Sequence, residues 1–186
     1  MIADYAAQIG VDLPPLSATQ VKNLEERLPD MVNVMNPFDM TVAVFDKMEL
    51  LTVTFDTIAG GDVDVVAAMM ETYDRPDAPF VEVMDGMTAA FCQAVNHHNV
   101  CGVVAGVLPE TLPESVRGPA VEAGVDPIQG LEEMIYAIEV GARLGEFYDR
   151  LTPELLDALP LPSGTRRLLL RTRNSRLWAE IDRRFR

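Results

Sequence analysis

Two nearly unbroken apolar runs, residues 63–70 and 100–108, constrain the fold of this chain more than any other feature. Such continuous apolar runs are typical of strands in a parallel sheet that helices cover on both faces. Segments with helical spacing precede, separate and follow the two runs. Because parallel strands are joined by long crossover connections, this alternation predicts an α/β fold with a doubly wound parallel sheet.

Local signals place the other elements. Residues 17–20 match a capping box that predicts a helix to about residue 28, and residues 111–114 match a second one. Gly124 fits the position just after the helix that the second box begins. We also expect helices over 2–9, 42–58, 80–96 and 131–148, and strands over 31–35 and 125–128. Since the first segment of the chain is helical, the first strand of a typical doubly wound sheet is expected to be missing.

The pattern changes after residue 150. Residues 160–164 form a Pro-, Ser- and Gly-containing linker, and the segment after it is expected to be a short helical extension. The formal charge of the 186 residues is -14, yet residues 161–186 carry eight of the fifteen basic residues, all arginine, and have a charge of +6. We therefore predict an α/β domain over 1–150 and an arginine-rich helical extension over 151–186.

Charge and hydropathy exclude several classes of partner. A surface as acidic as that of residues 1–160, with a charge of -20, repels phosphate backbones and anionic lipids, so no nucleic acid and no membrane is expected as a partner.

The longest uncharged stretch, residues 86–109, is interrupted by polar side chains, so it is not expected to span a membrane. The N-terminus lacks the basic and apolar regions of a signal peptide, and Cys92 and Cys101 lie in apolar stretches. We expect free thiols and a cytoplasmic protein.

The common nucleotide-binding, hydrolase, zinc-protease and CxxC motifs are all missing from the sequence. His97 and His98 are the only histidines, and they lie near the end of a predicted helix, where imidazolium groups complement the helix dipole. Adjacent side chains on a helix point in different directions. We therefore expect a structural role for the pair rather than a shared metal ion or a phosphoryl group.

Two polar segments follow predicted strands, where ligands of open α/β sheets bind. Glu71, Asp74 and Asp77 follow the first apolar run, and their oxygens are a weak candidate site for Mg²⁺. The second segment, residues 36–41, contains Asn36, Pro37, Asp39 and Thr41. Pro37 fixes a turn there, and Asp39 is placed to cap the next helix. We interpret this segment as a rigid loop that faces a ligand or a neighbouring domain.

Several ordered motifs together resemble one family. They are IGVDLPPLS at residues 9–17, LP at 28–29, NPFDMT at 36–41 and AGVDPIQGLE at 123–132. Over residues 1–150 the chain resembles the succinyl-CoA-ligase-like, flavodoxin-like domain of the NDP-forming acyl-CoA synthetases, the acetate-CoA ligase family. The sequence departs from this pattern in lacking the strand and the Ser-Gly-Gly turn that precede the first helix of the family domain, and with them an anion-binding helix N-terminus.

The resemblance implies a module rather than a complete enzyme. Family members interconvert an acyl-CoA, phosphate and NDP with an acid, CoA and NTP through an acyl phosphate and a phosphohistidine. His97 and His98 do not match the phosphohistidine motif. The implied partners are a CoA-binding domain and an ATP-grasp domain of the same enzyme, and the implied cofactors of that enzyme are CoA and ATP or ADP with Mg²⁺.

Two other functions stay open. In one, the chain is a stand-alone interaction module without catalytic activity, whose open sheet edge pairs with a partner chain or with a second copy in a homo-oligomer. In the other, the chain is an independent Mg²⁺-dependent enzyme that uses Glu71, Asp74 and Asp77.

Overall fold

The computed structural model describes residues 1–40, 44–45, 47–72 and 81–149. The predicted extension over 151–186 lies outside these residues. The chain divides into two compact units, Met1–Ile138 and Glu139–Arg186. In the described residues of the second unit, Glu139 is buried and forms an ion pair with Arg143 one helical turn later.

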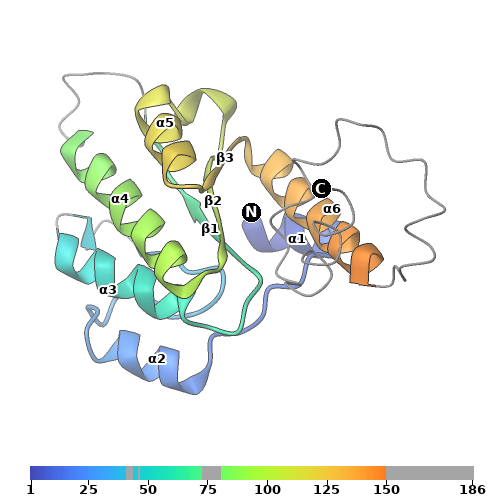
Figure 1. Ribbon diagram of the computed structural model, residues 1–186. Coiled ribbons are helices and arrows are strands. Elements are labelled where there is room, and N and C mark those ends of the chain that lie inside the picture. Colours follow the sequence, from blue (N-terminus) through green and yellow to red (C-terminus); the bar gives the residue numbers. More distant parts are fainter. Residues whose placement is uncertain (41–43, 46, 73–80, 150–186) are drawn as a thin grey trace, which may run out of the picture. The chain divides into compact units, whose positions relative to one another are not determined.

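The first unit is an α/β fold built on a parallel sheet (Figure 1). Its three strands are β1 (Val65–Met69), β2 (Cys101–Gly106) and β3 (Asp126–Gln129), and they lie in the order β1-β2-β3. Val65 pairs with Cys101, and Val103 pairs with Asp126. The described residues contain six α-helices: α1 (Ile2–Ile9), α2 (Ala18–Glu25), α3 (Met48–Ala59), α4 (Val81–His98), α5 (Glu114–Glu122) and α6 (Leu131–Asp149).

Helices cover both faces of this sheet. The larger core lies between one face and α3, α4 and α5 (Figure 1), and in it Val66, Ala68 and Val104 of the sheet are buried together with helical side chains such as Phe55 and Phe91. On the other face Val103 and Ala105 pack with α1 and with the first two turns of α6. The central strand β2 is therefore buried on both faces, as its apolar run predicts, and the α/β class is confirmed.

Most of the local signals that predicted helices are confirmed. Ser17 caps α2 and exchanges hydrogen bonds with Gln20 in a complete capping box. Gly124 follows α5 with a φ of 78°, a conformation that glycine adopts without steric cost. The second capping box is wrong, because α5 begins at Glu114 without a side-chain cap and Thr111 instead closes a short 3-10 helix, η2 (Pro109–Thr111).

The strand predicted over residues 31–35 is wrong. Exposed and more buried side chains alternate there as in a strand, with Val32 buried between Met31 and Asn33, but the segment pairs with no strand in the described chain. The next helix also begins later than predicted, at Met48 rather than near residue 42. Alternation is a local property, whereas a strand requires a neighbour to accept its backbone hydrogen bonds.

No disulfide bond joins Cys92 and Cys101. Cys92 is buried in the larger core, and this burial raises the pKa of its thiol. Cys101 is exposed at the start of β2 although it lies in an apolar run. Of the helices that the structure describes, none has the length and apolar character needed to span a bilayer.

Candidate functional site: a histidine and aspartate cluster at the ends of two helices

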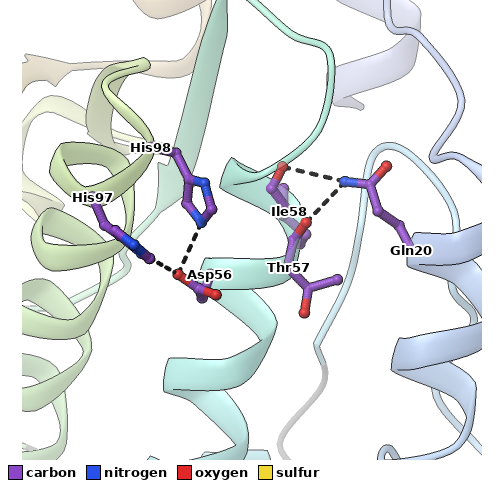
Figure 2. Close-up of polar contacts among 6 residues, drawn as sticks. All are labelled: Gln20, Asp56, Thr57, Ile58, His97 and His98. Atoms are coloured by element: carbon purple, nitrogen blue, oxygen red, sulfur yellow. Dashed lines mark hydrogen bonds and ion pairs between the residues drawn. The ribbon is translucent and has the colours of Figure 1, made fainter.

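The only two histidines of the chain meet a single carboxylate (Figure 2). His97 Nδ1 lies 3.0 Å from Asp56 Oδ1, and His98 Nε2 lies 2.9 Å from the same oxygen. Asp56 belongs to the last turn of α3, and both histidines end α4. The side chains of adjacent helical residues were expected to point in different directions, but here both reach the same carboxylate oxygen. His97 does so through Nδ1, the ring nitrogen nearer the backbone, and His98 through Nε2, the ring nitrogen farther from it.

The cluster combines exposed and shielded groups. The exposed fractions of the side chains are 68% for His97, 50% for Asp56 and 28% for His98. The pKa of Asp56 lies below its usual value, mainly because of the hydrogen bond with His97. Burial acts in the opposite direction and raises this pKa, whereas the hydrogen bond and the charge of His98 lower it further. The two rings lie 4.6 Å apart between centroids.

Glycine and glutamine positions shape the surroundings of the cluster. A Cβ at Gly60 would lie 3.0 Å from the ring carbon Cε1 of His98, so a glycine leaves room for that ring. On the other side of α3, Gln20 Nε2 donates hydrogen bonds to the carbonyl oxygens of Thr57 and Ile58 (Figure 2). Both carbonyls belong to the last turn of α3, where helical partners run out, and the Ile58 carbonyl also accepts a hydrogen bond from the backbone amide of Gly61.

The packing of α3 against α4 aligns the ends of the two helices. The rings of Phe55 and Phe91 meet edge to face, with 5.5 Å between their centroids. Phe55 directly precedes Asp56 in the sequence, so this buried pair fixes the helical turn that carries the carboxylate. Since α3 leads into β1 and α4 into β2, the cluster lies at the amino end of the sheet.

Glu71 lies at the opposite, carboxyl edge of the sheet. Its Oε1 accepts a hydrogen bond from the backbone amide of Val107, just beyond β2, and lies 3.1 Å from the hydroxyl of Thr111. The carboxylate thus ties the end of β1 to the turn after β2. Asp74 and Asp77 lie outside the described residues, so the three-carboxylate Mg²⁺ site stays a prediction.

The predicted loop at residues 36–41 is held by its first residue. Asn36 Nδ2 donates a hydrogen bond to the carbonyl oxygen of Pro14, 2.9 Å away, and a cis peptide bond joins Asn36 to Pro37. Asp39 is exposed, and the N-cap of α3 is Lys47; the helix start near residue 42 that Asp39 was predicted to cap lies outside the described residues, so this cap stays a prediction. Thr41 lies outside the described residues. No strand of the described residues precedes the loop, so the strand end from which its place at the carboxyl edge was predicted is not found there.

Sequence reasoning found the histidines but not their partner. Asp56 is the one charged residue of the segment TVTFDTIA, and its spacing from His97 carries no motif. A pair of adjacent histidines at a helix end was the available signal. No protein-family model and no curated protein matches this chain.

Proposed function

We propose that the chain is a module of an NDP-forming acyl-CoA synthetase, an acid-thiol ligase, in which it contributes an active-site wall and a domain interface without being catalytic alone. The proposal rests on the four sequence motifs that resemble the flavodoxin-like domain of that family. It agrees with the parallel α/β fold. CoA, ATP or ADP and Mg²⁺ belong to the complete enzyme, in which CoA-binding and ATP-grasp domains are the partners.

The observation that carries the proposal is the difference between the two edges of the sheet. The outer strand β3 contains Asp126 and Pro127, a charge and a residue without a backbone donor, which discourage further pairing. The other outer strand, β1, reads VVAAM and has neither. A sheet that continues into another strand requires an edge of this kind, which is apolar and has no charge or proline to oppose pairing.

The strand order fits the same interpretation. In a flavodoxin-like sheet of order 2-1-3-4-5, the last three strands are neighbours in sequence order, and the first strand pairs beside the third. The order β1-β2-β3 matches those last three strands. The first strand, which the family domain carries just before the helix equivalent to α1, would then pair with β1.

Two of the motifs that resemble the family also meet in space. The hydrogen bond from Asn36 to the carbonyl of Pro14 joins the segment 36–41 to the segment 9–17. In the proposed module, Asn36, Pro37, Asp39 and Thr41 shape a loop toward a neighbouring domain and transfer no protons.

The DNA that flanks the reading frame tests this proposal. We expect upstream codons for a strand, a Ser-Gly-Gly turn and a CoA-binding domain, and a coding segment for an ATP-grasp domain in the same gene or next to it. Flanks that encode none of these parts would contradict the proposal.

A stand-alone interaction module is a second candidate, and the same β1 edge favours it. Without an upstream strand, two copies of the chain would pair their β1 edges, because exposed strand edges accept added strands. Such a homo-oligomer would bury the exposed side chain of Ala67 near the pairing edge.

For this second candidate, we expect Ala67→Lys to convert a dimer to a monomer, since a charge on an edge strand opposes pairing. Light scattering during size-exclusion chromatography would measure the mass, and circular dichroism would verify the fold. Tyr136→Lys is the matched control, because it adds the same charge at an exposed helical position. A wild-type chain that is monomeric at every concentration tested argues against this candidate.

A further inference from the structure

We propose that Asp56, His97 and His98 form a binding site for a divalent transition-metal ion of the Zn²⁺ class. The site is independent of the proposed ligase function, because it lies at the amino end of the sheet and uses none of the motifs that resemble the family. It also includes every imidazole in the chain.

The distances suit a shared ion. Bonds of about 2.0–2.2 Å from zinc to nitrogen or oxygen put neighbouring ligand atoms of a tetrahedral site roughly 3.3–3.6 Å apart. The nitrogens of His97 and His98 lie 3.0 and 2.9 Å from Asp56 Oδ1, and the three ligand atoms all lie within 4.8 Å of one another. Small shifts of exposed side chains would open the centre of this triangle for an ion (Figure 2).

The helix ends favour a cation at this position. Each helix carries a partial negative charge at its C-terminus, where carbonyl groups lack helical partners. Asp56 lies in the last turn of α3, which ends at Ala59, and His97 and His98 end α4. The two dipoles and the carboxylate therefore all attract positive charge to the same place.

The ligands are also held in place before an ion arrives. Asp56 follows Phe55, which is fixed by its ring contact with Phe91, and His98 fits against Gly60. Rigid helical positions reduce the conformational entropy that the ligands lose on binding. The more exposed His97 is the ligand that closes the site.

The ligand types determine the class of ion. Two imidazoles and one carboxylate match the nitrogen and oxygen ligands of zinc, whereas Mg²⁺ prefers oxygen ligands alone. Three protein ligands leave a fourth position for water, which the exposure of His97 and Asp56 permits. Zn²⁺ bound there would link the C-terminal ends of α3 and α4.

The test is a titration of the full-length chain, without a histidine tag, with ZnCl₂. Calorimetry should give one ion per chain, and long-range ¹H–¹⁵N spectra should show changes at Nδ1 of His97 and Nε2 of His98. At a free Zn²⁺ concentration of about a hundred times Kd, the Tm should rise by roughly 5–10 °C. MgCl₂ should produce none of these changes, and EDTA should reverse them.

Two ligand variants and two controls assign the binding to this cluster. Asp56→Asn and His97→Gln change exposed or half-exposed ligands and should weaken Zn²⁺ binding by at least about tenfold, since even losing a partner of a ligand costs about 10- to 100-fold. Glu49→Gln is the matched control, because it removes an exposed carboxylate from the other end of α3. Cys101→Ser tests the exposed thiol, and both controls should retain wild-type affinity.

Several results would overturn the proposal. Zn²⁺ that leaves both imidazole spectra unchanged does not bind here, and equal affinity in Asp56→Asn or His97→Gln places the ion elsewhere. Loss of binding in Cys101→Ser would assign the ion to the thiol. A ratio of one ion to two chains would identify a contact between copies instead of a site within one chain.

Discussion

Replacing Phe91 with alanine is expected to lower the free energy of unfolding by about 4 kcal/mol, the range measured when a buried phenylalanine leaves a cavity. Phe91 is only 1% exposed and lies at the contact between α3 and α4. The substitution also removes the edge-to-face contact with Phe55, whose centroid lies 5.5 Å away. Urea denaturation followed by circular dichroism would measure the loss.

The same substitution should affect the histidine cluster. Loosening α3 against α4 lets Asp56 move relative to His97, so the Zn²⁺ affinity proposed above should fall even though no ligand is changed. Phe91→Leu, which retains most of the side-chain volume, should lose less than half as much stability. If Phe91→Ala lowers the free energy of unfolding by less than about 1 kcal/mol, the surrounding side chains must move in to fill the cavity, contrary to this expectation.

Gly106→Ala is expected to destabilise the chain by about 2–3 kcal/mol through overpacking. A Cβ at this position would lie 2.6 Å from the Thr111 hydroxyl and 3.0 Å from the carbonyl oxygen of Leu108. Thr111 is completely buried, and its hydroxyl lies 2.8 Å from that same carbonyl. Because neither group can swing away, the turn after β2 must shift, and with it the attachment of Glu71.

Gly141→Ala is the matched control for this prediction. Nothing lies within 4 Å of a Cβ at Gly141, which is exposed within α6. Alanine is favoured over glycine inside a helix, so this variant should gain about 0.5–1 kcal/mol. Equal free energies of unfolding for Gly106→Ala and the wild type, measured by the same urea titration, would disprove the steric argument.

The elements that were predicted well are those whose cause is local. The capping box at Ser17 and Gln20 places the start of α2 because the two side chains bond backbone groups three residues apart. The continuous apolar character of β2 identifies a strand buried on both faces, since no exposed face requires polar residues. Gly124 marks a helix end through the φ of a single residue.

The failures all depend on a partner distant in the sequence. Residues 31–35 alternate as a strand does, but no described strand lies beside them. Thr111 has the side chain of a helix cap, yet its hydroxyl donates a hydrogen bond to the carboxylate of Glu71, forty residues earlier in the chain.

The sequence by itself determined the α/β class, the cap of α2 and the glycine turn after α5, because spacing and local hydrogen bonds follow from neighbouring residues. Only the tertiary structure decided that β1 is an apolar sheet edge and that Asp56 meets His97 and His98. Asp56 is forty-one residues from His97 along the chain, and the packing of two helices brings them within 3.0 Å. Such a contact depends on the buried surface between α3 and α4, which no local pattern encodes.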